Sequence, residues 1–145
     1  MLSVRLDPSS RHAVSNIHNL DKKALKGIRQ GLYRVGLNLK NTADKGILRS
    51  SKSGVYYKYK GRKVRASASG EYPANRSGEN RRGIDFTVKG KRRLYFGGRA
   101  PHSKWLVLKD PKHGGRDFLL KAINQTHQKN RRILITELDK AVKAR

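Results

Sequence analysis

Residues 19–46 read NLDKKALKGIRQGLYRVGLNLKNTADKG, and this stretch decides the fold. Its apolar side chains recur every three or four residues, at Leu25, Ile28, Leu32, Val35 and Leu39. That spacing places them on one stripe of an α-helix. Asn19 suits the N-cap position, with Asp21 in the first turn. The sequence therefore predicts an amphipathic helix of about 25 residues that ends near Lys45 and Gly46.

Three glycines, Gly27, Gly31 and Gly36, lie inside this predicted helix. Each costs up to about 1 kcal/mol of helix stability relative to alanine. We therefore expect another part of the structure, a strand or a neighbouring subunit, to approach the helix closely at these positions.

The chain of 145 residues is long enough for one domain. Residues 1–18 mix polar residues with a short apolar alternation, so we expect an N-terminal arm there and a single domain over 19–145.

Apolar and polar residues alternate after residue 54, which is typical of β-strands. The candidate strands are Val55 to Lys60, Lys63 to Ala68, Gly83 to Lys89, Arg92 to Phe96 and Lys104 to Lys109. Gly61-Arg62 and Gly90-Lys91 are short enough to be hairpin turns and predict two antiparallel pairs. Residues 68–82 have no periodicity and are predicted to form a long loop.

A second helix is predicted from Asp117, a suitable cap, to the C-terminus. Its polar middle, residues 125–132, is expected to meet a neighbouring subunit. The predicted fold class is α+β: an antiparallel sheet of about four to five strands, flanked on one face by a long N-terminal helix and a long C-terminal helix.

The chain carries 35 Lys and Arg against 10 Asp and Glu, a formal net charge of +25. A compact domain with this charge repels itself, which favours an anionic partner. The densest cluster, residues 55–65, combines three tyrosines with five cations. This is the composition of a surface that stacks bases and pairs with phosphates. It equally fits a hairpin whose Tyr and Val side chains fill one face while Lys and Arg face water.

Several classes of function are disfavoured. The chain has no cysteine, which excludes disulfide scaffolds and thiol nucleophiles. The five histidines lack metal-ligand spacing. Glu71, Glu79 and Asp85, with Lys89, resemble a nuclease site only faintly, and ion pairing explains them equally well. We expect no enzyme activity, metal or cofactor. We also expect no secretory leader and no association with a membrane. Trp105 is interpreted as a core anchor rather than a contact aromatic.

Two further motifs are GEYPANRSG at residues 70–78 and RDFLLKAI at residues 116–123. Together with the order helix, hairpin, terminal helix, they resemble the head–tail joining (neck and tail-completion) proteins of long-tailed bacteriophages, over about residues 20–140. The resemblance implies a virion protein, made in the host cytoplasm, that forms a ring, expected to be a hexamer, in the neck. Its partners would be portal or head-closure proteins, tail tube or terminator proteins, and non-specific double-stranded DNA.

In such a ring, some residues would face the DNA in the lumen. Our candidates are Lys58, Lys60, Arg62, Lys63, Arg65, Arg81 and Arg82. Other residues would lie between subunits. Our candidates are Tyr72, Pro73, Phe118, Leu119, Ile133 and Leu134. The alternative is a monomeric basic nucleic-acid-binding protein of ribosomal or nucleoid type, which would have the same size and charge.

Overall fold

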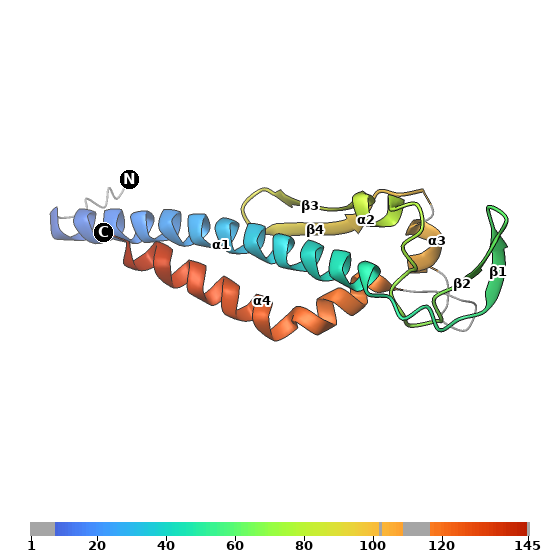
Figure 1. Ribbon diagram of the computed structural model, residues 1–145. Helices are drawn as coiled ribbons and strands as arrows, with labels where there is room; N and C mark the ends of the chain where they lie inside the picture. Colours follow the sequence, from blue (N-terminus) through green and yellow to red (C-terminus); the bar gives the residue numbers. More distant parts are fainter. Residues whose placement is uncertain (1–7, 102, 109–116, 145) are drawn as a thin grey trace.

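The computed structural model describes residues 8–101, 103–108 and 117–144, with side chains from residue 15 onward (Figure 1). The described elements are α1 (Pro8–Leu48), β1 (Tyr56–Tyr59), β2 (Arg62–Arg65), α2 (Glu79–Gly83), β3 (Ile84–Lys89), β4 (Arg93–Gly98), α3 (Ser103–Leu108) and α4 (Phe118–Lys143). The chain is thus a mixture of helix and strand with a long helix toward each end. Its strands form two separate two-stranded antiparallel sheets, β1-β2 and β3-β4.

The central element is α1, which lies between α4 on one side and the β3-β4 sheet on the other (Figure 1). Its glycines make both contacts possible. A Cβ on Gly27 would lie 2.7 Å from the Ala141 Cβ, and one on Gly31 would lie 3.0 Å from Leu134, both in α4. A Cβ on Gly36 would overlap the Phe86 ring of β3. Because Gly27 and Gly36 are separated by about two and a half helical turns, they lie on opposite faces.

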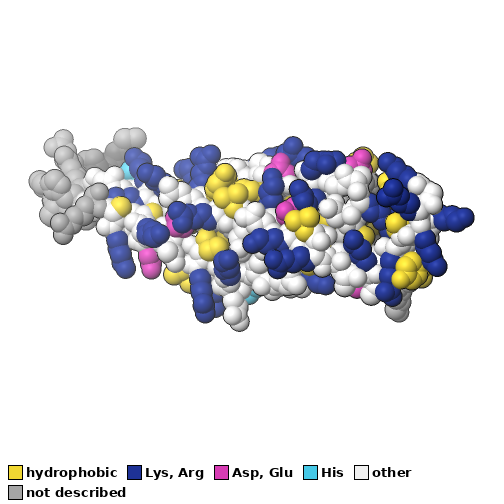
Figure 2. Space-filling model, viewed as in Figure 1, with side chains coloured by type: hydrophobic (Ala, Val, Ile, Leu, Met, Phe, Trp, Pro, Cys, Tyr) yellow, Lys and Arg dark blue, Asp and Glu magenta, His cyan; other side chains and the backbone are white. Residues whose placement is uncertain are grey.

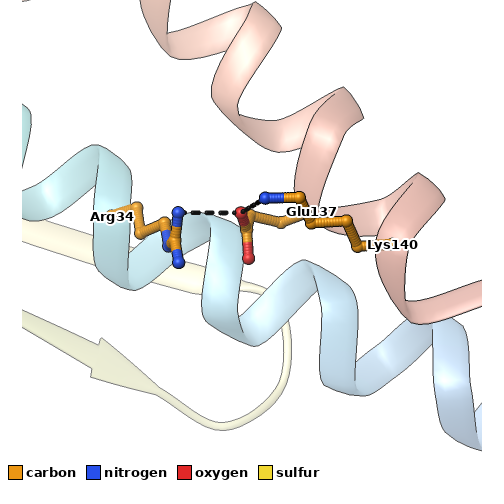
Figure 3. Close-up of polar contacts among 3 residues, drawn as sticks. All are labelled: Arg34, Glu137 and Lys140. Atoms are coloured by element: carbon orange, nitrogen blue, oxygen red, sulfur yellow. Dashed lines mark ion pairs between the residues drawn. The ribbon is translucent and has the colours of Figure 1, made fainter. Parts of the chain in front are cut away.

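The contact between α1 and α4 includes a buried carboxylate (Figure 3). The Glu137 side chain of α4 is only 6% exposed, and its Oε1 lies 3.0 Å from Nη1 of Arg34 in α1. Lys140, one turn further along α4, approaches the same oxygen at 3.5 Å. Nearer the middle of α4, the Asn38 amide donates to Asn130 at 2.7 Å. The polar middle of α4, expected to meet a neighbour, is therefore partly engaged with α1 of the same chain.

The hydrophobic core is small and lies where α1, β3 and the start of α4 meet. Its buried members are Ala43, Ile47, Tyr72, Ile84, Phe118 and Ala122. Asp117 caps α4 as predicted, since its carboxylate accepts a hydrogen bond from the Leu120 amide. This cap directs Phe118, which is fully buried, into the core.

The expected sheet of four to five strands is not seen, because the two predicted hairpins do not pair with each other. Nor do both long helices lie on one sheet face, because α1 separates α4 from β3-β4. The predicted strand at Lys104 to Lys109 was wrong: residues 103–108 form α3, and residue 109 lies outside the described residues. Leu106 and Val107 are neighbours that both pack against the core, which the alternation of a strand would prevent.

Two further expectations were wrong. Trp105 is 65% exposed on α3 and is not a core anchor. The helix begins at Pro8 rather than after an Asn19 cap, so residues 8–18 are not an irregular arm, whereas residues 1–7 lie outside the described residues. Proline suits a first helical turn, and no Gly or Pro interrupts residues 9–26. The periodicity missed this part of the helix, where Ile17 is 68% exposed and so does not belong to a buried stripe.

The contact between α1 and α4 can be tested at Gly27. Replacing a glycine inside a helix by alanine normally stabilises it. We expect Gly27→Ala to lower the free energy of unfolding instead, by about 1–3 kcal/mol, because the new methyl would also lie 2.9 Å from the Glu137 carbonyl oxygen. Urea denaturation followed by circular dichroism measures the change. Gly97→Ala, where no atom lies within 4 Å of the new Cβ, is the control. A Gly27→Ala variant more stable than the native chain would contradict the close approach.

Candidate nucleic-acid interface

The hairpin β1-β2 carries most of the predicted nucleic-acid-binding residues and lies at the end of the molecule away from the described chain ends (Figure 1). Its two-residue turn is Lys60-Gly61, with φ of 48° and 77°. Positive φ at both positions is characteristic of a type I′ hairpin turn. The predicted turn, Gly61-Arg62, was one residue too late, and Arg62 instead pairs with Tyr59.

This register assigns the side chains to two faces. The face that we call the inner face carries Tyr57, Tyr59, Arg62 and Val64, and the one that we call the outer face carries Tyr56, Lys58, Lys63 and Arg65. The predicted separation of Tyr and Val from Lys and Arg therefore holds with two exceptions. Tyr56 lies among the cations, and Arg62 lies among the tyrosines.

The inner face is covered in part by the loop that precedes α2. The Arg76 guanidinium lies 4.0 Å from the centroid of the Tyr57 ring and 5.6 Å from that of Tyr59. A groove of about 470 Å³ separates hairpin and loop. The Tyr57 hydroxyl and Asn75 Oδ1 are buried and lack a hydrogen-bond partner among the described residues, so water or a ligand would have to satisfy them. Arg76 is not among the seven named candidates, and its position over the tyrosine rings could not be predicted because it lies in a loop without periodicity.

The outer face is open and positively charged. Tyr56 is 59% exposed, and the Lys63 ammonium and Arg65 guanidinium lie 5.0 and 5.4 Å from its ring centroid. Lys58 stands directly opposite Lys63 in the register. Figure 2 shows Lys and Arg side chains gathered at this end of the molecule. Such a surface can pair with several phosphates at once.

The base of the hairpin is fixed by Glu71, which follows Gly70. Its carboxylate accepts hydrogen bonds from the hydroxyls of Ser51 and Ser53, from the Ala68 amide at 2.8 Å and from the Ser53 amide at 3.1 Å. The two serine hydroxyls, followed by the Ala68 amide, lower the pKa of Glu71 from 4.5 to about 2. Arg65 donates to the carbonyl oxygens of Gly54 and Ser53, which ties the outer face to the same base.

Arg81 and Arg82, also predicted to face DNA, are engaged elsewhere. Arg81 Nε lies 3.1 Å from the Asp44 carboxylate of α1. Arg82 donates to the carbonyl oxygen of Ser77 at 2.9 Å. The positive charge of Arg81 is therefore balanced, unlike that of the cations on the outer face.

The predicted subunit-interface residues lie against other parts of the same chain to different degrees. Tyr72, Pro73 and Phe118 are buried within the single chain. Leu119 packs against the core and Leu134 against Gly31, and both are partly buried. Ile133 is also partly buried.

The two motifs that carry the resemblance contact each other in the fold. The Tyr72 hydroxyl donates to Oε1 of Gln125, two residues beyond the second motif, at 2.7 Å, and burial raises the pKa of this hydroxyl. The Lys121 ammonium donates to the Gly70 carbonyl oxygen at 2.7 Å and lies 5.2 Å from the Tyr72 ring. These contacts hold the start of α4 against the loop at residues 70–78.

The acids considered for a nuclease site do not converge. Asp85 pairs with Arg99 at 2.5 Å and with Lys40 at 3.5 Å. A hydrogen bond from the Phe86 amide, followed by the charges of Arg99 and Lys40, lowers the pKa of Asp85. Within residues 8–101, 103–108 and 117–144, no group of three or more His, Cys, Asp or Glu is placed to hold a metal ion. In the same ranges, no helix is long and apolar enough to span a membrane.

Comparison with protein-family models, curated proteins and solved structures found no match to this chain. A function for this chain therefore has to be argued from the chemistry of the described residues. The most distinctive feature of their surface is the outer face of β1-β2.

The hydrogen bonds to Glu71 predict how stability depends on pH. Because the pKa of Glu71 is lowered in the folded state, its contribution is fully present above about pH 4.5 and is lost as the pH falls toward about 2. We expect Glu71→Gln to lower the thermal midpoint at pH 6, and the difference from the native chain to shrink between pH 4.5 and 2. Thermal melts at pH 6, 4 and 2.5 measure this. A difference that is constant over this range would refute the assigned role of the carboxylate charge.

Proposed function

We propose that this chain is a structural subunit that assembles with copies of itself into a ring, in the neck of a tailed-phage virion, through which double-stranded DNA passes. The motifs at 70–78 and 116–123 support the virion assignment. A ring of six copies, between portal or head-closure proteins and the tail tube or terminator, is what the resemblance implies.

The observation that carries the proposal is the large surface of the single chain. Its accessible surface is 11019 Å², whereas a compact monomer of 16.4 kDa exposes about 7,500 Å². A fully extended chain with the length of the residues outside the described ranges would contribute about 2,800 Å² of this surface. The accessible surface that remains is still larger than that of a compact protein with the mass of the described residues. Excess surface of this kind is expected of a chain that is stabilised by packing against copies of itself.

Exposed apolar side chains give this surface the chemistry of subunit contacts. They are distributed along the molecule: Ile17, Leu20, Tyr33 and Leu37 on α1, Trp105 and Leu108 on α3, and Leu120, Ile123, Ile135 and Val142 on α4. Residues on different sides of a subunit suit a ring, in which each copy contacts a neighbour through two different surfaces. The net charge of +25 would balance the DNA that passes through the centre.

A second candidate, a monomeric nucleic-acid-binding protein, is favoured by one specific observation. The outer face of β1-β2 could bind phosphates without any assembly, because all four of its residues come from one hairpin. The two candidates differ in oligomeric state.

Salt separates the two candidates. Copies that each carry +25 repel one another, and salt screens this repulsion while apolar contacts persist. We expect the purified protein, free of nucleic acid, to form a defined oligomer whose population rises between 0.05 and 0.5 M NaCl, as measured by size-exclusion chromatography with light scattering. A monomer at every salt concentration would reject the ring and leave the monomeric nucleic-acid-binding protein.

A further inference from the structure

The outer face of β1-β2 concentrates like charges on one side of a two-stranded hairpin. Lys58 and Lys63 are directly opposite each other, an arrangement that destabilises an isolated pair of strands. No acidic residue occurs between residues 54 and 70 to balance them. A two-stranded hairpin is marginally stable even without this repulsion. An anionic partner at this face would remove the destabilisation.

The two faces of the hairpin are not equivalent. On the inner face, Arg76 already lies against the Tyr57 and Tyr59 rings, so their aromatic surface is partly occupied. On the outer face, the cations surround a solvent-exposed tyrosine. On the outer face, Lys58 and Lys63 are both exposed to an approaching ligand.

We propose that the outer face, formed by Tyr56, Lys58, Lys63 and Arg65, binds the phosphate backbone of double-stranded DNA without reading its sequence, and that the inner face takes no part. This inference rests on the proposed function only in assuming that DNA is the polyanion. It narrows the candidate DNA-facing residues from seven to three cations, Lys58, Lys63 and Arg65, and adds Tyr56.

The face is organised before binding. The Arg65 guanidinium donates to the backbone oxygens of Gly54 at 2.9 Å and Ser53 at 3.0 Å, so its position is fixed relative to the hairpin base. Tyr56 lies beside both Arg65 and Lys63 and limits the positions that their charged groups can occupy. Groups held in place in this way lose less conformational entropy on binding.

Duplex DNA fits this chemistry better than other anionic partners. A membrane-binding hairpin would need large apolar side chains, but the outer face offers a single tyrosine. Single strands bind through rings that stack on bases, whereas the Tyr56 ring already carries two cations. Side-chain amides, which read adenine, do not occur on this face, and the Arg65 guanidinium, the group best suited to read guanine, is bound to the carbonyl oxygens of Gly54 and Ser53. Contacts to phosphates are therefore expected to dominate.

The test compares two double variants of the full chain with equal loss of charge. Lys58→Gln/Lys63→Gln changes the outer face, and Lys91→Gln/Arg92→Gln changes exposed cations at the turn of the other hairpin. Binding of a fluorescein-labelled 20-base-pair duplex is measured by anisotropy from 0.05 to 0.3 M NaCl. We expect Lys58→Gln/Lys63→Gln to weaken binding about 10- to 30-fold at 0.15 M salt and to reduce the slope of log K against log salt by about 1.8. The control is expected to change affinity by less than about threefold.

Unfolding cannot account for the expected loss of binding. Removing the repulsion between Lys58 and Lys63 should leave the thermal midpoint unchanged or raise it. Arg62→Gln, on the inner face, should bind duplex like the native chain. Equal effects of the two double variants, or tighter binding of a 20-nucleotide single strand or of phosphatidylserine vesicles than of duplex, would overturn the inference.

Light scattering on the same samples separates this inference from the proposed function. If both double variants form the native oligomer but bind duplex equally, the outer-face inference fails and the ring stands. If the chain is a monomer whose duplex binding depends on Lys58 and Lys63, the ring fails and the outer-face inference stands.

Discussion

The structure depends on the close approach of α4 and β3 to α1. Gly27 and Gly31 admit α4 on one face, and Gly36 admits the Phe86 ring of β3 on the other. A side chain at these positions would separate the layers and expose the small core around Ile84 and Phe118. The resulting body consists of α1 as a middle layer between one helix, α4, and one two-stranded sheet, β3-β4. This small number of packed elements explains why a chain of this length buries so little of its surface and why many apolar side chains remain exposed.

The same body engages most of the acidic side chains that the structure describes. Asp44 pairs with Arg81, Asp85 with Lys40 and Arg99, and Glu137 with Arg34 and Lys140, while Asp117 caps α4. Glu71 is held by serine hydroxyls and backbone amides at the hairpin base. Because these ion pairs lie outside the hairpin, the cations of β1-β2 keep their positive charge, and the function of the hairpin is to be sought in what that charge binds.

Periodicity and turn chemistry predicted the elements whose side chains alternate between core and solvent. The α1 stripe from Leu25 to Leu39, the Asp117 cap and both antiparallel hairpins were confirmed, as was the close approach at the three glycines. Pattern failed where tertiary contact decides. Near the start of α1, Ile17 and Leu20 are exposed. Helix α3 alternates like a strand but packs Leu106 and Val107 together, and the separation of the hairpins depends on α1 lying beside only one of them. For the site, the strand register gave the cations, whereas the position of Arg76 over Tyr57 depends on a loop without periodicity.

In the ring that we propose, exposed apolar surface joins copies of this chain and the basic hairpins face passing DNA. Single-particle electron microscopy of the purified protein mixed with a 60-base-pair duplex tests it most directly. We expect closed rings with the β1-β2 hairpins directed inward and duplex density along the central axis. Dispersed single copies, or rings whose hairpins point outward from an empty centre, would contradict it.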